Sequence, residues 1–299
     1  MSISNTWGGR VGFPTTEVML LLVAVFWGTS YGMTKSALVF TSVFMFLAIR
    51  FLMTFVFLLI PTIQDFRARR NKDWKSAIPT GVILLAIFCC EVLGVSRTTA
   101  TNAAFLISLS TILTAFVEVV VNRQHLNRQL LGLACLSVIG VGMLTFEGTF
   151  RLSLNTGDWL ILLAALLRAL MVTSTKLFTE DKQVTTLSLT ALQSLVVGLG
   201  ALIIALFQHT TQTALIFPKS LNFWLITLYL VLCCTLFAFF IQNYAVRRTS
   251  PTRVSLLMGS EPLFGAIFAI LWLDESLTLV QCLGGAIILG AVTTASLSK

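Results

Sequence analysis

The feature that most constrains this chain is a succession of long apolar runs joined by short polar connections. A helix needs about 20 mostly apolar residues to cross the hydrocarbon core of a bilayer, where lipid cannot bond an open backbone. The composition agrees, because 57% of the residues are hydrophobic and only 11% are charged, whereas about 25% are charged in a soluble domain. We therefore predict an all-α integral membrane protein. Its ten predicted transmembrane helices are residues 17–37, 41–61, 77–95, 100–121, 129–146, 158–176, 185–207, 222–246, 252–273 and 278–297.

The basic residues predict how the chain is oriented. With ten spans both termini lie on one side of the membrane, and cytoplasmic loops carry an excess of Lys and Arg. Placing the termini in the cytoplasm puts most of the 20 Lys and Arg inside, which also accounts for the net charge of +8 without a nucleic-acid partner. We expect a multi-pass protein of the cell inner (plasma) membrane, N-in and C-in. The exceptions to the bias are Arg50 and Arg168 within the membrane and, outside, Lys35, Arg97, Arg151 and Lys219.

Motifs for metal binding or catalysis are not encoded. The six cysteines lie in apolar runs without C-x-x-C spacing, and the two histidines, His125 and His209, lie in polar connections. Buried free cysteine behaves as a small hydrophobe. Residues 28–32 satisfy G-x-S-x-G, but they lie inside a predicted helix, whereas the hydrolase motif needs a strand-to-helix turn and a histidine base. We predict no metal site, no cofactor and no enzyme activity.

The chain repeats itself at two offsets. One pairs Thr98 with Thr249 and aligns the fourth span with the ninth, and the other pairs Lys35 with Lys176 and aligns the first span with the sixth. Each half has five spans, an odd number, so the halves enter the membrane in opposite directions. We predict two inverted five-helix repeats, residues 17–150 and 151–299, after a short cytoplasmic tail, residues 1–16. Secondary transporters recurrently have this architecture, with the substrate site near midplane between the repeats.

Short motifs that recur in order along both halves also carry a resemblance to a known family. They are residues 26–28, FWG; 47–51, LAIRF; 101–106, TNAAFL; 157–160, GDWL; 261–266, EPLFGA; 273–275, LDE; and 284–288, GGAII. Together they resemble the EamA-type permeases of the drug/metabolite transporter superfamily, over about residues 17–297. The resemblance implies a ten-helix carrier made of two five-helix repeats, and it suggests export of a small metabolite such as an amino acid.

Two positions depart from the family pattern. The family usually ends its fourth span with a glycine-glutamate pair, but here Gln124 stands opposite Glu275. The sixth span commonly carries Trp where this chain has Arg168, opposite Trp27. The second departure places a permanent positive charge in the membrane, so a substrate of closely similar relatives need not be carried here.

Two arginines are expected at bilayer depth, where a charge costs about 2.5–3.5 kcal/mol on insertion scales and therefore faces a wet cavity or a partner. For Arg50 the family resemblance favours a structural role, bonding unpaired carbonyls or a carboxylate, with cargo contact as the alternative. For Arg168 two interpretations stand equally. It either forms an ion pair with Glu91 or Glu261, or it anchors a carboxylate of the cargo.

Three carboxylates are expected at the same depth. Glu261 is predicted to couple transport to protons by exchanging one as its exposure alternates, with a constant ion pair to an arginine as the alternative. The following Pro262 is expected to kink the ninth span by freeing the carbonyl of Met258. Glu91 is expected to coordinate cargo or to reach headgroups, and Glu118 to snorkel toward the inner interface. The five charges sum to one excess negative charge, which is compatible with proton antiport.

Aromatic and amide side chains complete the predicted substrate site. Aromatic rings beside a few polar groups suit a small amphipathic ligand, and helix packing is the alternative interpretation. Gly28 and Gly32 form a G-x-x-x-G that lets a neighbouring helix approach closely. Besides Glu91 and Arg168, the predicted substrate-binding residues are Trp27, Tyr31, Gln193, Gln242 and Asn243.

These observations favour a secondary active transporter that works by alternating access, with proton-coupled export suggested by the resemblance. The alternatives are a multidrug or toxic-compound efflux carrier and, from another class, a non-transporting membrane assembly or sensor subunit. The expected partners are a small-molecule substrate, protons and the lipid bilayer. The chain is expected to act as a monomer or homodimer.

Overall fold

The computed structural model describes residues 15–98, 100–121, 127–144, 146, 154–209, 218–273 and 278–297, and these contain helices and turns but no strand. The all-α prediction is confirmed for this part of the chain. Most of the predicted tail, the junction at 150–151, Gln124 and Glu275 lie outside the described residues. The elements are α1 (Thr15–Leu38), α2 (Val43–Arg67), η1 (Trp74–Ser76), α3 (Ala77–Val95), α4 (Ala100–Ser108), α5 (Ser110–Val121), α6 (Arg128–Leu144), α7 (Thr156–Thr179), α8 (Thr186–His209), α9 (Leu221–Val231), η2 (Leu232–Phe237), α10 (Ala238–Val246), α11 (Pro251–Met258), α12 (Glu261–Leu273) and α13 (Leu279–Leu297).

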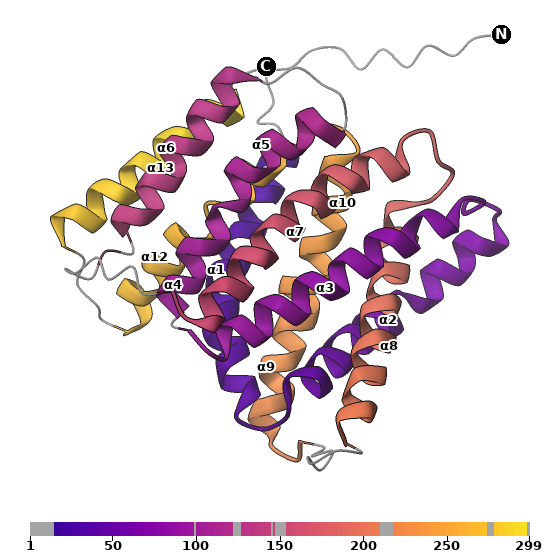
Figure 1. Cartoon of the computed structure of the whole chain (residues 1–299). Helices are drawn as coiled ribbons and strands as arrows, with labels where there is room; N and C mark the ends of the chain where they lie inside the picture. The colour runs from indigo at the N-terminus through magenta and orange to yellow at the C-terminus, as the bar shows by residue number, and fades with distance from the viewer. Residues whose placement is uncertain are drawn as a thin grey trace, which may run out of the picture.

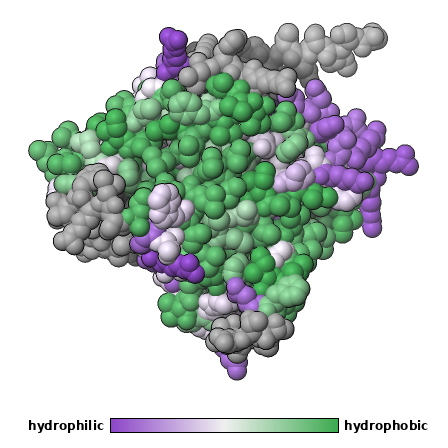
Figure 2. Space-filling view, in the orientation of Figure 1, coloured by the Kyte–Doolittle hydropathy of each residue, from purple (hydrophilic) through white to green (hydrophobic). Residues whose placement is uncertain are grey.

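Seven segments of the described chain are long and apolar enough to cross a membrane. Figure 2 shows a broad hydrophobic surface, with hydrophilic side chains gathered toward its margins. The apolar helices α6 and α13 are shorter, and the ninth predicted span is divided, so the count of ten stays a prediction. The seven segments are Thr15–Leu38, Val43–Arg67, Trp74–Val95, Ala103–Val121, Thr156–Thr179, Thr186–Gln208 and Leu221–Val246.

Two of the predicted spans are broken at corresponding places. The fourth is divided at Leu109 into α4 and α5, and the ninth ends at Met258 and restarts at Glu261. The prediction of one kinked helix in the ninth span is therefore wrong. Pro262 cannot donate to the carbonyl of Met258, and the chain ends one helix there and begins another. Pro262 lies in the first turn of α12, where a helix needs no such bond.

The helices pack in matching pairs around the centre. α1 packs against α12, and α7 packs in the corresponding way against α5. α3 lies along α7, whereas the continuous α9–η2–α10 helix lies along α1. The α2–α8 pair and the α6–α13 pair lie at opposite ends of the molecule in Figure 1. The helices α1 and α7 therefore occupy the middle of the bundle, flanked by the broken helices α4–α5 and α11–α12.

A glycine contact sets the distance between α1 and α12. A Cβ atom at Gly28 would lie 2.7 Å from the carbonyl oxygen of Glu261 and 2.7 Å from the amide nitrogen of Gly265. A Cβ at Gly32 would meet nothing within 4 Å, because this face of α1 is exposed one turn further on. Gly28 thus lies at a close helix contact as expected, whereas the predicted packing role of Gly32 is wrong.

The connection between α2 and α3 docks onto the connection between α7 and α8. Buried Asn71 donates to Ser188 Oγ at 2.8 Å and accepts from the backbone N–H of Thr185 at 3.0 Å. Asp65 accepts from Thr185 Oγ1 at 2.7 Å. The basic side chains of this connection are exposed around Asn71. These bonds join the two halves at one end of the molecule.

Candidate substrate site

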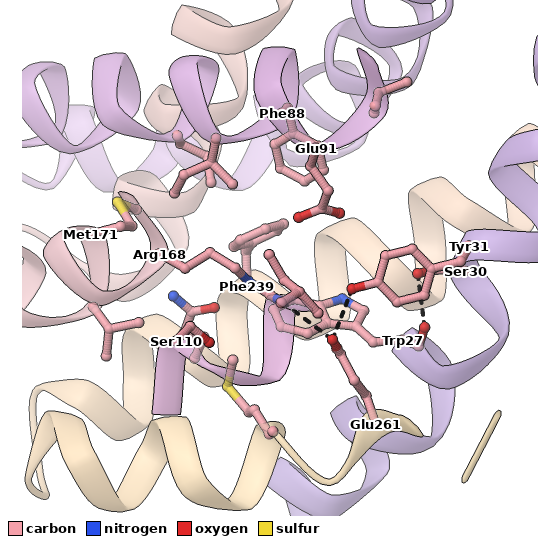
Figure 3. A pocket seen from close by; sticks show the side chains of 18 of the residues that line it. Trp27, Ser30, Tyr31, Phe88, Glu91, Ser110, Arg168, Met171, Phe239 and Glu261 are labelled. Atoms are coloured by element: carbon pink, nitrogen blue, oxygen red, sulfur yellow. Dashed lines mark hydrogen bonds and ion pairs between the residues drawn. The ribbon is translucent and has the colours of Figure 1, made fainter. Parts of the chain in front are cut away.

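An internal cavity of about 50 Å³ brings most of the predicted site residues together. Its volume has room for a few water molecules. Figure 3 shows aromatic and charged side chains from different helices around it. The predicted site residues that line it are Trp27, Tyr31, Arg50, Glu91, Arg168, Gln242 and Glu261.

Glu261 is the first residue of α12, and its carboxylate bonds two partners from other helices. Its side chain is 3% exposed, and its Oε1 accepts from Tyr31 Oη at 2.8 Å and from Arg168 Nη1 at 3.3 Å. Of the two partners predicted for Arg168, the structure therefore has Glu261. The break between α11 and α12 places this carboxylate inside the bundle. Through Tyr31 and Arg168, this one carboxylate joins α1, α7 and α12.

Arg168 is also held by an aromatic ring. Its guanidinium carbon lies 4.5 Å from the centroid of Trp27, within the range of a cation–π contact. Trp27 Nε1 donates to the carbonyl of Cys234 at 2.9 Å. This carbonyl belongs to the π-helical segment η2, and such segments often mark functional sites. The ring, which comes from the first half of the chain, thus contacts two residues of the second half.

Arg50 is bonded to neutral groups. Its Nε donates to Thr235 Oγ1 at 2.7 Å and its Nη2 to the carbonyl of Cys234 at 3.5 Å. Its guanidinium carbon lies 5.7 Å from the ring centroid of Phe51 and 5.3 Å from that of Phe88. The carbonyl that Arg50 bonds also accepts from Trp27, and the Arg50 side chain lines the cavity.

Glu91 differs from the other charged residues of the cavity. Within the described part of the chain its carboxylate makes no hydrogen bond and no ion pair, and Figure 3 shows it facing the same hollow as Arg168 and Phe239. Gln242, which the repeat alignment pairs with Glu91, lines the cavity too and also makes no side-chain hydrogen bond with a described residue. Glu91 therefore faces the hollow rather than the membrane surface.

Gln193 and Asn243 were predicted to bind substrate, but they are not among the residues that line the cavity. Asn243 Nδ2 donates to Gln193 Oε1 at 2.8 Å and to Thr190 Oγ1 at 3.0 Å. Gln193 Nε2 donates to Thr80 Oγ1 at 2.9 Å. The two amides bond to each other and to threonines because they meet where α3, α8 and α10 pack. Sequence spacing alone did not indicate this packing.

Glu118 also differs from its prediction. It does not snorkel, because its side chain is buried and its Oε2 accepts from both the backbone N–H and the hydroxyl of Thr252. A carboxylate at a helix start bonds free N–H groups and suits the helix dipole. Glu118 thus caps α11 and is not part of the cavity. The cavity then holds two arginines and two glutamates, and its formal charge is zero rather than negative.

Two polar clusters at the ends of α1 and α7 were paired by the repeat but not predicted as site residues. In the Lys35 cluster, Lys35 Nζ donates to the carbonyl of Thr98 at 3.0 Å, and Thr98 Oγ1 donates to Asp158. In the Lys176 cluster, Lys176 Nζ donates to the carbonyl of Thr249 at 3.3 Å. The sequence signal was the pairing of each lysine and threonine, without an indication that they touch.

An ion pair lies close to the second cluster. Arg253 Nη2 lies 3.0 Å from Oε1 of Glu17, at the start of α1. Arg253 lies four residues after Thr249, in the first turn of α11. The Lys176 cluster is therefore next to the start of α1, whereas the Lys35 cluster is next to its end. Because Lys35 follows Glu17 by 18 residues in α1, the two clusters lie about 27 Å apart along this helix.

The helical architecture and the charged internal cavity define a multi-pass membrane protein of the transporter class. The profile of the EamA-like transporter family matches residues 15–146 and 155–297, so the chain belongs to this family, as the motifs predicted.

Individual relatives agree with this assignment. A protein of Archaeoglobus fulgidus described as an uncharacterized transporter is 27% identical over 285 residues, which cover 94% of this chain and 85% of that protein. A protein of Methanothermobacter thermautotrophicus with the same description is 26% identical over 77% of this chain and 66% of its own length. A solved crystal structure of another protein matches with a TM-score of 0.76 at 13% identity, covering 95% of this chain and 97% of that one. That structure shares the fold.

Proposed function

We propose that this protein is a secondary active transporter that exports a small metabolite, such as an amino acid, across the inner membrane in exchange for protons. The observation that carries the proposal is the bonding of one buried carboxylate, Glu261, to Arg168 and Tyr31 beside a cavity at a helix break. Ten spans arranged as two inverted repeats, with both termini in the cytoplasm, form the proposed architecture. The proposed unit is a monomer or homodimer.

Three matched features support the inverted repeat. The breaks at Leu109 and at residues 259–260 fall in spans that the sequence repeat aligns. α1 packs on α12 as α7 packs on α5. Lys35 and Lys176 make the same contact, each with the carbonyl of a paired threonine, in clusters next to opposite ends of α1. Inverted repeats place one such contact on each side of a membrane, as alternating access requires.

The proposed mechanism couples the end clusters to the central carboxylate. Opening the Lys35 cluster would expose the cavity to one side, and opening the Lys176 cluster would expose it to the other. A proton on Glu261 leaves Arg168 without its buried counter-charge, which weakens the contact between α7 and α12 and favours their movement. Release of the proton restores the ion pair. Only states with one end open at a time can exchange cargo for protons without a leak.

Flux across reconstituted membranes tests this function. Proteoliposomes that contain the purified protein are loaded with a mixture of unlabelled amino acids. Counterflow of each labelled amino acid is then measured with and without a pH gradient. We expect saturable counterflow that a pH gradient accelerates, and loss of the pH response in Glu261→Gln. The matched control is Glu118→Gln, a buried carboxylate outside the cavity, which should keep the pH response. Saturable flux that is the same in Glu261→Gln and wild type at every pH would refute the coupling role.

A further inference from the structure

The cavity contains one charge that no residue of the described chain neutralises by direct contact. Arg168 pairs with Glu261 and lies over Trp27, and Arg50 bonds a hydroxyl and a carbonyl. The carboxylate of Glu91 has no such partner, yet it faces the hollow. A carboxylate at bilayer depth normally meets a cation or water. A lining carboxylate without a direct ion pair can receive the positive charge of a ligand.

We propose that Glu91 binds a protonated amino group, and that the cargo is an amine-bearing compound with an apolar side chain. The cargo part of this statement rests on the transport function proposed above. An ammonium has three N–H donors and no acceptor. Glu91 supplies charged acceptors, and the side-chain carbonyl of Gln242 at the same cavity supplies a neutral one. The two residues come from α3 and α10, so an ammonium between them would contact both halves of the chain.

The side chains around Glu91 are largely apolar. Its neighbours along α3 that also line the cavity are Ile87, Phe88 and Val92, and α7 contributes Met171 across from them. These side chains offer apolar contact area to a hydrocarbon or aromatic tail.

The other charges of the cavity disfavour a simple anion. A cargo carboxylate without an amino group could reach Arg168 only by competing with Glu261, which would leave that buried carboxylate without its partner. An ammonium, in contrast, can bind the carboxylate of Glu91, which makes no hydrogen bond or ion pair with a described residue. A zwitterion adds no net charge to a cavity whose formal charge is zero. The expected order of affinity is therefore amino acid and amine first, with the corresponding acid well behind.

Matched compounds test the assignment by direct binding. Isothermal titration calorimetry on the full-length protein in detergent would use leucine, isoamylamine and 4-methylpentanoate, which share an isobutyl tail. A second set is phenylalanine, 2-phenylethylamine and 3-phenylpropanoate. We expect at least one amine-bearing compound of a set to bind at least tenfold more tightly than its acid. Glu91→Gln should weaken that binding at least tenfold, Glu91→Asp should retain most of it, and Glu118→Gln should leave it unchanged.

The outcomes separate this inference from the transport function. Equal binding of acid and amine, full amine binding by folded Glu91→Gln, or no binding of any amine-bearing compound overturns the amine site. Counterflow in proteoliposomes is a separate measurement. Amine binding that depends on Glu91 without counterflow would keep the site and refute the carrier. Counterflow of the acids that is unaffected by Glu91→Gln would keep the carrier and refute the site.

Discussion

The ends of this molecule carry matching contacts, whereas its centre does not. At the ends, Lys35 bonds the carbonyl of Thr98, and Lys176 bonds the carbonyl of Thr249, residues that the two sequence offsets pair. At the centre, paired positions differ in charge or polarity. The same offsets place Trp27 opposite Arg168, Ser110 opposite Glu261, and Gln242 opposite Glu91.

The proposed carrier function explains the difference between ends and centre. Two conformations that open on opposite sides interconvert readily when their closing contacts are similar in energy, which matched end clusters provide. A single cargo site has no such requirement. One half can supply the charges while the other supplies a ring or an amide. The predictions below test whether charge at the centre and matched contacts at the ends are separable.

The largest expected effect comes from leaving one central charge without its partner. Arg168→Gln and Glu261→Gln should each destabilise the protein by about 3–5 kcal/mol, because a buried charge then lacks its counter-charge. The double variant removes both charges and should recover most of this loss. Thermal unfolding in detergent measures the effect, with melting temperatures lowered by several degrees in the single variants. Single variants no less stable than the double variant would show that the pair does not hold the centre together.

The next effect tests the close approach that brings α12 and its carboxylate to α1. Gly28→Val places a side chain 2.7 Å from rigid backbone atoms of α12, whereas Gly32→Val enters open space. Overpacking of this kind costs about 1–3 kcal/mol, so Gly28→Val should unfold at a lower temperature. In this variant, replacing Arg168 should cost less stability than it does in the wild type. Gly32→Val is the matched control on the same helix. Equal losses in the two variants would contradict the assigned contact.

The sequence predicted which charged residues lie at the centre of the molecule, but not which of them form an ion pair. The high cost of a charge in lipid identified Arg168, Glu91 and Glu261 as candidates. It could not decide which carboxylate meets the arginine, because that depends on where the ninth span breaks. A single proline indicated an irregularity there, but a kink and a complete break have the same sequence signal. The break places Glu261 against Arg168, whereas Glu91 makes no direct ion pair with a described residue.

Other differences between expectation and structure arose from the ambiguity of polar residues in apolar runs. Gln193 and Asn243 looked like cargo ligands, yet each finds partners in neighbouring helices. Glu118 looked close enough to an interface to reach it, yet it caps a helix from the other half of the chain. Long-range packing decided all three cases. The family and the all-helical class, in contrast, followed from motifs and apolar runs that are local in the sequence.

A moderate effect tests the end clusters against each other. Lys35→Met and Lys176→Met each remove one charged hydrogen bond, worth about 1.5 kcal/mol or more, so each should shift the balance between the two open states about tenfold. The shifts should be opposite. The measurement is labelling of Ser110→Cys in the cavity by an impermeant thiol reagent from either side, with the native cysteines replaced. Shifts toward the same side in both variants would contradict mirrored clusters, and the Lys35→Met, Lys176→Met double variant should return toward the wild-type balance.

The smallest effect concerns the acidic residues at the helix starts, where the symmetry is only approximate. The offset that pairs the two lysines also pairs Glu17 with Asp158. Glu17 forms a partly exposed ion pair with Arg253, whereas buried Asp158 accepts from Thr98 Oγ1 and from the backbone N–H of Asn155 in a capping box. A partly exposed pair contributes about 0.2–1 kcal/mol, and loss of a helix cap about 1 kcal/mol. Glu17→Gln should therefore cost less stability than Asp158→Ala, and its cost should fall further at high salt. Denaturant unfolding at low and high ionic strength measures the stability of both variants. If Glu17→Gln lost as much stability as Asp158→Ala, and lost it equally at low and high salt, the two acidic residues would contribute alike despite their different exposure.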